Sequence, residues 1–178
     1  FVPNLTFGPK FISDVRKYSN KTFDVHLMIN RVEKFLDEYI EAGSDIISFH
    51  LEIDEDIEKI ITRIKKKGLK CGLAIKPNTS WIEIQPYLNL VDQVIVMTVE
   101  PGFGGQAFME DQIIKIKEIS NHLKSNNLNV EIEIDGGVNF ETGQKCVEAG
   151  AHVLVAGSFL FNQGDLIKAT NTLSEKFN

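Results

Sequence analysis

The chain has 178 residues, of which 43% are apolar and 25% charged, a composition typical of one soluble globular domain. No apolar run approaches the length of a membrane span, so we expect no membrane partner. The net charge of −6 argues against nonspecific nucleic-acid binding but is compatible with a small phosphorylated ligand. Cys71 and Cys146 form no metal or redox spacing, which fits a reducing cytoplasm.

Strand-like and helical patterns alternate along the whole chain. Apolar, β-rich runs predict strands at 22–29, 46–52, 70–76, 93–99, 130–135 and 153–156. Helical periodicity predicts helices over 10–18, 32–42, 55–67, more weakly 81–88, 110–124, 140–149 and 166–176. A glycine suited to the left-handed position after a helix precedes three of the strands, at Gly43, Gly68 and Gly150. Such alternation predicts βαβ units and a parallel sheet.

The two faces of the predicted strands differ in polarity. In the first strand, Val25 and Leu27 alternate with Asp24 and His26, and the second and fifth strands show the same pattern. Central strands of an open, doubly wound sheet are apolar on both faces. A closed barrel explains the difference, because its apolar face meets outer helices and its polar face lines the interior near the mouth. We therefore expect a single (β/α)8 barrel domain of the TIM type over residues 1–178.

The number of strands is too small for a closed barrel. The sequence shows six, whereas the fold has eight strands over about 200 residues or more. The chain also opens without Met, in a segment, 1–9, that has the character of a loop. The simplest explanation is that an N-terminal β-α-β portion of roughly 40 residues is missing, through truncation or because the sequence covers only part of the protein.

A glycine-rich turn follows the fourth predicted strand, in Met97-Thr-Val-Glu-Pro-Gly-Phe-Gly-Gly-Gln106. Glycines let backbone N–H groups approach an anion closely, and a following helix N-terminus adds a favourable dipole. Two more glycine turns, Gly136–Gly137 and Gly157–Ser158, end the last two strands, where barrels of this type commonly bind phosphate. Three such turns at consecutive strand ends predict a phosphate cradle.

Two polar residues at the expected mouth are candidates for chemistry. His26 lies on the polar face of its strand, where a structural role and a ligand role are equally compatible with the pattern. Asp135 ends a strand before two glycines, so it either caps the turn or acts as a metal ligand or general acid/base. Met28 and Met97 fit core packing or an apolar lining around the reacting atoms. His50 and Lys76 are weaker candidates.

These motifs resemble the ribulose-phosphate 3-epimerase family over essentially the whole chain. The resemblance rests on Phe23-Asp-Val-His-Leu-Met28, Phe49-His-Leu-Glu52, Met97 through Gln106, Asp135-Gly-Gly-Val138 and Gly157-Ser158, in this order. It implies an isomerase of carbohydrate metabolism that interconverts D-ribulose 5-phosphate and D-xylulose 5-phosphate in the pentose phosphate pathway. The reaction implied is an epimerisation at C3 through a metal-stabilised enediolate, with two carboxylates as acid and base and no nucleotide cofactor.

The resemblance also implies roles for particular residues. One divalent metal, most often zinc or iron, is held in the family by two His and two Asp, of which His26 and Asp135 match two. Asp135 would also be one of the two proton-transfer carboxylates. Met28 and Met97 match methionines that line the active site. The phosphate- and substrate-binding loops match Gly102, Phe103, Gly104, Gly105, Gly136, Gly137, Gly157 and Ser158.

The remaining metal ligands, the partner Asp and a substrate-binding Ser belong to the family's first two strands, which this sequence lacks. A polypeptide that truly started at Phe1 would therefore be expected to show little or no activity. Three alternatives stay open: an epimerase of a six-carbon sugar phosphate such as allulose 6-phosphate, a lyase that uses Lys76, and a noncatalytic phosphate-binding barrel. The sequence determines neither the metal's identity nor the oligomeric state, and the resemblance is compatible with a homo-oligomer, since family members are often oligomeric.

Overall fold

The computed structural model describes residue 1 and residues 6–177, and its centre is one parallel sheet. Its six strands lie side by side in chain order, and each consecutive pair is parallel. The strands are β1 (Asp24–Leu27), β2 (Ile46–His50), β3 (Lys70–Ile75), β4 (Gln93–Met97), β5 (Glu131–Asp135) and β6 (Val153–Val155). All six predicted strands are thus confirmed, each somewhat shorter than expected. Among the described residues, β1 and β6 each pair with a strand on one side only.

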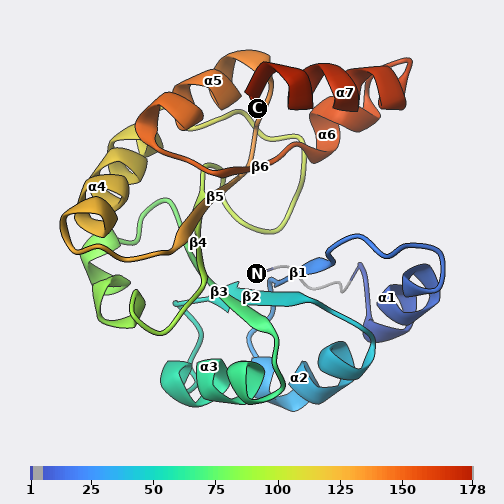
Figure 1. Cartoon of the computed structure of the whole chain (residues 1–178), viewed down its shortest axis with the longest axis vertical. Coiled ribbons are helices and arrows are strands. Elements are labelled where there is room, and N and C mark those ends of the chain that lie inside the picture. The colour runs from blue at the N-terminus through green and yellow to red at the C-terminus, as the bar shows by residue number, and fades with distance from the viewer. Residues whose placement is uncertain (2–5, 178) are drawn as a thin grey trace.

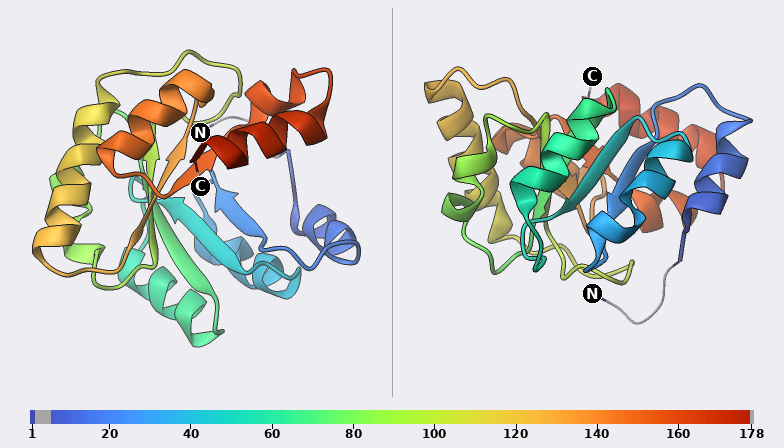
Figure 2. Two further views of the ribbon diagram at one scale, coloured as in Figure 1. Left: turned by 45° about the horizontal axis from the view of Figure 1, so that its top comes forward. Right: turned by 90° about the horizontal axis from the view of Figure 1, so that it is seen from below.

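Helices alternate with the strands, as the sequence predicts. They are α1 (Pro9–Arg16), α2 (Val32–Glu41), α3 (Ile57–Lys66), α4 (Gln112–Ser125), α5 (Phe140–Ala149), α6 (Gly157–Phe161) and α7 (Leu166–Phe177). The sheet is curled, and α2 to α5 follow its convex side (Figures 1 and 2). An open, doubly wound sheet would carry helices on both faces. The arrangement is that of six consecutive units of a (β/α)8 barrel, which confirms the predicted fold class.

The hydrophobic core lies between the convex face of the sheet and the helices. Helix α3 shows how the sequence builds it: Ile57, Ile60, Ile61 and Ile64 recur on one face of the helix, and all four are buried. Asp56 fixes the start of this helix, because its side chain accepts a hydrogen bond from the backbone N–H of Lys59. Full burial of one isoleucine side chain stabilises the folded state by about 1.5–3 kcal/mol. Val25 and Leu27 of β1 belong to the same core.

The concave face is less uniformly polar than the strand patterns suggest. Strands β1, β2 and β5 do place polar side chains there, but β3 and β4 are dominated by apolar residues on both faces. Ala74, Ile95, Met97 and Val99 form a separate buried cluster inside the curl, and Met28 packs against it. The prediction of a polar interior face rested on the patterns of β1, β2 and β5. In the middle of the sheet, β3 and β4 fill the interior with apolar side chains instead.

Two local predictions need correction. Residues 81–88 form two short 3-10 turns, η1 (Trp81–Glu83) and η2 (Gln85–Tyr87), and no continuous helix. Pro86 lacks the N–H that an α-helix would need there, and a capping box between Ser80 and Glu83 closes the first turn locally. Helix α6 was not predicted, since five residues are too few to show helical periodicity.

The predicted helix-ending glycines are confirmed by their backbone angles. Gly43, Gly68 and Gly150 have φ values of 99°, 80° and 111°, which are in the left-handed region. The structure tests the expected loop over 1–9 only in part, because residues 2–5 lie outside the described residues. At its end, Pro9 already begins α1. No helix among the described residues is long and apolar enough to cross a membrane.

Candidate active site

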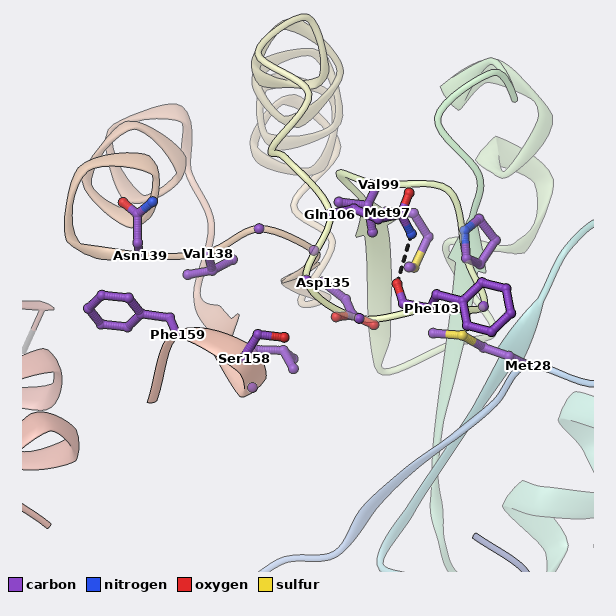
Figure 3. A pocket seen from close by; sticks show the side chains of 18 of the residues that line it. Met28, Met97, Val99, Phe103, Gln106, Asp135, Val138, Asn139, Ser158 and Phe159 are labelled. Carbon is purple, nitrogen blue, oxygen red and sulfur yellow. Dashed lines mark hydrogen bonds between the residues drawn. The ribbon is translucent and has the colours of Figure 1, made fainter. Parts of the chain in front are cut away.

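A cavity of about 410 Å³ opens at the carboxyl ends of β4, β5 and β6. All three glycine turns singled out in the sequence reach it, as does Asp135 (Figure 3). In Figure 3 Asp135 lies between Ser158 on one side and Met28 and Met97 on the other. Four further lining residues belong to motifs quoted from the sequence, Val99, Pro101, Gln106 and Val138. The lining is completed by four that the sequence did not single out: Asn139, Val155, Phe159 and Asn162.

The loop after β4 is shaped by its own hydrogen bonds. The side-chain amide of Gln106 donates to the backbone oxygens of Glu100 (2.7 Å) and Phe103 (2.8 Å), which closes the turn. Gly102 and Gly105 have φ values of 134° and 78°, which only glycine adopts readily. The Phe103 side chain is 65% exposed at the tip of this loop. A stable turn thus presents backbone groups to the cavity, as an anion site requires.

The loop after β5 is locked onto the end of β4. The backbone N–H of Thr98 donates to the oxygen of Asp135 (2.9 Å), and the Thr98 hydroxyl donates to the oxygen of Gly136 (2.5 Å). Gly137 has a φ of 63°, and a Cβ on it would lie 2.7 Å from the backbone N of Phe108. A Cβ on Gly136 would lie 2.5 Å from Val99. The fold itself therefore requires glycine at both positions.

Gly157 is different, because nothing in the described structure demands glycine there. Its φ lies outside the left-handed region, and a Cβ built on it would meet no atom within 4 Å. It begins helix α6, whose first backbone N–H groups have no partner within the helix. Ser158 follows it, with its hydroxyl 3.3 Å from where a Cβ of Gly104 would be. The loops after β4 and β6 therefore meet across the cavity and leave room at Gly157.

His26 and Asp135 face one another from β1 and β5. Nδ1 of His26 lies 3.6 Å from Oδ2 of Asp135, although the two residues are 109 positions apart in the sequence. Both side chains are partly exposed, at 14% and 23%. The structure thus brings together the two residues that the sequence proposed as metal ligands. Among the described residues, however, no three His, Cys, Asp or Glu side chains cluster so that they could hold a metal.

Behind His26 lies a second histidine, His50 of β2, which is fully buried. The Nε2 atoms of the two rings are 2.9 Å apart, and Nδ1 of His50 lies 3.3 Å from Oε2 of Glu52. Burial lowers the pKa of His50 to about 4, so its ring is neutral at pH 7. Sequence reasoning ranked His50 low, and only the contact between neighbouring strands reveals its link to His26.

Glu52 is ionised although it is half-buried. Burial would raise the pKa of its carboxyl, but hydrogen bonds from His50, the backbone N–H of Lys76 and the hydroxyl of Thr79 outweigh this and lower the pKa to about 2. The Lys76 bond is 2.7 Å long. Lys76 itself, the weak catalytic candidate, places its Nζ 4.7 Å from the centre of the Phe1 ring. The result is a connected polar row from Glu52 through His50 and His26 to Asp135.

Comparison with known proteins agrees with this geometry. The sequence profile of the ribulose-phosphate 3 epimerase family matches residues 1–161. The chain is 40% identical over 174 residues to ribulose-phosphate 3-epimerase of Bacillus subtilis (strain 168), covering 97% of this chain and 80% of that protein. The chain belongs to the ribulose-phosphate 3-epimerase family. The resemblance drawn from the glycine loops, Asp135 and His26 is thereby confirmed.

A second epimerase and a solved structure are also similar to this chain. The chain is 40% identical over 171 residues to the chloroplastic ribulose-5-phosphate-3-epimerase of Arabidopsis thaliana, covering 95% of this chain and 61% of that protein. Among solved structures, a 3-hexulose-6-phosphate synthase superposes with a TM-score of 0.70 at 17% identity, covering 96% of this chain and 81% of that one. At this identity the likeness supports the barrel fold alone.

Proposed function

We propose that this protein is an isomerase that interconverts D-ribulose 5-phosphate and D-xylulose 5-phosphate in the pentose phosphate pathway. The observation that carries the proposal is the convergence of Asp135 and three glycine loops on one cavity, in a chain of the epimerase family. A sugar phosphate of five carbons needs an anion site and a proton-transfer group a few ångströms apart, and the cavity offers both kinds of group.

The loops would bind the phosphate end of the substrate. Backbone N–H groups around Gly102–Gly105, Gly136–Gly137 and Gly157–Ser158 suit a dianion without requiring a basic side chain. Phosphate binding remote from the reacting carbon would position that carbon beside Asp135. Met28 and Met97 would give the opposite wall an apolar lining that excludes water.

Asp135 would carry out proton transfer at the carbon next to the ketone. Epimerisation removes this proton and returns one on the opposite face, so the carboxylate acts as base in one direction and as acid in the other. Its position at the end of β5, with the backbone held by Thr98, fixes the carboxyl group at the mouth of the barrel. The second carboxylate of such a mechanism is not assigned to any residue of this sequence.

We also propose that His26 and Asp135 are two of the ligands of a divalent cation, zinc or iron. An imidazole nitrogen and a carboxylate oxygen are donors that both metals accept. Their separation of 3.6 Å is close to the distance of about 3.3 Å between neighbouring ligands of tetrahedral zinc. When bound, such a cation stabilises negative charge on the substrate's ketone and hydroxyl oxygens. The other ligands would have to come from groups that the described chain does not provide.

The remaining features of the proposal concern the protein's setting. We expect a cytoplasmic enzyme whose partner is a small sugar phosphate, neither nucleic acid nor membrane. A homo-oligomer is compatible with this setting. Both cysteines are free and buried, as is common in a reducing compartment.

The substitution Asp135→Asn, made in the natural protein, tests the assignment. It should lower turnover by a factor of about 10²–10⁴, because general acid–base catalysis contributes on that scale, while affinity for inorganic phosphate stays unchanged. Turnover is measured as formation of xylulose 5-phosphate, and phosphate affinity by calorimetry. Asp54→Asn is the control, because Asp54 is exposed and does not line the cavity. Near-normal turnover of Asp135→Asn would refute the role of this carboxylate.

A further inference from the structure

The polar row behind the cavity determines which ring nitrogen of His26 carries a proton. Glu52 accepts hydrogen bonds from the backbone N–H of Lys76 and the hydroxyl of Thr79, as a carboxylate does, so the hydrogen in its 3.3 Å contact with His50 belongs to Nδ1 of His50. His50 is fully buried, which favours the neutral imidazole with a single N–H, and its Nε2 is therefore a bare acceptor. The hydrogen in the 2.9 Å contact between the rings then belongs to Nε2 of His26. In its neutral form, His26 is left with a bare lone pair on Nδ1.

This lone pair has a specific neighbour. Nδ1 of His26 faces Oδ2 of Asp135 at 3.6 Å, so two acceptor atoms point at each other with no hydrogen between them. Two facing acceptors repel unless a positive charge lies between them. His50 stabilises this order of protons, because it is fully buried and solvent does not compete for its two contacts.

We infer that His50 and Glu52 are positioning residues that fix the tautomer of His26 and keep its Nδ1 free to bind a cation together with Asp135. A histidine ligand usually donates its second N–H to a carboxylate or a backbone oxygen. Here His50 lies between the ligand His26 and the carboxylate of Glu52, so Glu52 determines the tautomer of His26 through His50. This inference rests on the proposed metal role of His26, but the proton order itself does not need the metal.

The first test uses the wild-type protein without metal. Nitrogen-15 NMR of labelled histidine rings reports directly which ring nitrogens are protonated. We expect His26 to be protonated at Nε2 and bare at Nδ1, and His50 to be protonated at Nδ1 and bare at Nε2. The opposite order, or a His26 ring that averages between both tautomers, would overturn the inference without any mutation.

The second test uses the substitution Glu52→Gln to reverse the order of protons on the two histidine rings. The backbone N–H of Lys76 and the hydroxyl of Thr79 both donate to Oε1 of Glu52, so the glutamine should keep its oxygen there and turn its NH2 toward His50. His50 must then accept at Nδ1 and donate from Nε2, which pushes the proton of His26 onto Nδ1. We expect both tautomers to reverse and zinc affinity to fall by about 10–100-fold.

Glu55→Gln is the matched control. Glu55 also accepts hydrogen bonds from backbone N–H groups, those of Val32 and Glu33, but it contacts neither histidine. Both tautomers and zinc affinity should remain as in the wild type. Reversed tautomers in Glu52→Gln with unchanged zinc affinity would overturn the inference. Wild-type protein with the expected tautomers that binds no zinc would instead refute the proposed metal role and leave the proton order standing.

Discussion

The open space at Gly157 gives a test of the phosphate cradle at the scale of one residue. In Gly157→Ala the new methyl group would meet no protein atom within 4 Å, so the fold should tolerate it. It would project into the space where the phosphate is proposed to bind. We expect an unchanged unfolding midpoint and an affinity for inorganic phosphate lowered about tenfold, which corresponds to about 1.4 kcal/mol. Calorimetric titration with phosphate, alongside thermal unfolding, makes the measurement.

Gly164→Ala is the control for this substitution. Gly164 also has free space around a built Cβ, but it lies in the turn between α6 and α7 and does not line the cavity. Its alanine variant should bind phosphate as the wild type does. Equal affinity in both variants and the wild type would place the phosphate away from Gly157.

The sequence predicts individual site residues to the extent that they depend on strand alternation. His26 and Asp135 could be selected because each lies on the polar face of a strand near its carboxyl end. The contact between His26 and His50 was not predictable in this way. It depends on the register of β1 against β2, in which His26 pairs with Ser48, and on the orientation of two side chains. Composition and periodicity carry no information on either quantity.

At the scale of elements, two helix-ending glycines with the same backbone role differ in their surroundings. Gly68 and Gly150 both have left-handed φ values, 80° and 111°. A Cβ on Gly68 meets nothing within 4 Å, whereas a Cβ on Gly150 lies 2.7 Å from Cβ of Ser120 in α4. Gly150 therefore also determines how closely the end of α5 approaches α4.

Alanine at these two positions should separate backbone strain from crowding. Gly68→Ala incurs only the left-handed strain, about 1 kcal/mol. Gly150→Ala adds overpacking against Ser120 and should lose about 2–4 kcal/mol in total. Urea unfolding measures both values as shifts of the midpoint at constant slope. Equal losses in the two variants would show that α4 moves away from Gly150 freely and that the close approach is not a constraint.

Helices were predicted correctly where several local signals agree. The prediction failed where a single turn determines the backbone conformation. Helix α5 was predicted with its observed bounds, because its periodic pattern stops at Gly150. The structure adds a capping box at Asn139 that begins the helix. The segment 81–88 has a helical apolar pattern but contains Pro86, and its local turns override the pattern. Helix α6 leaves no periodic trace, yet it contributes Gly157 and Ser158 to the cavity. Short elements of this kind are specified by tertiary packing.

At the scale of the whole molecule, the two cysteines report on whether the described sheet unfolds as one unit. Cys71 lies in strand β3 and Cys146 in helix α5, two elements in different parts of the molecule (Figure 1). Both are fully buried, and burial raises the pKa of each thiol to about 12. Neither thiol can react as a thiolate until the structure around it opens. The alkylation rate of each therefore measures the opening free energy of its own region.

A single barrel domain predicts the same alkylation rate at both positions. If β1 to β6 and their helices open cooperatively, iodoacetamide should modify Cys71 and Cys146 in parallel, at a rate proportional to the unfolded fraction. Mass spectrometry of the two peptides follows each site separately, and both should react at similar rates once urea has unfolded the chain. A markedly faster reaction at Cys146 would mean that α5 and its neighbours open independently of β3. The chain would then contain two folding units that share one sheet.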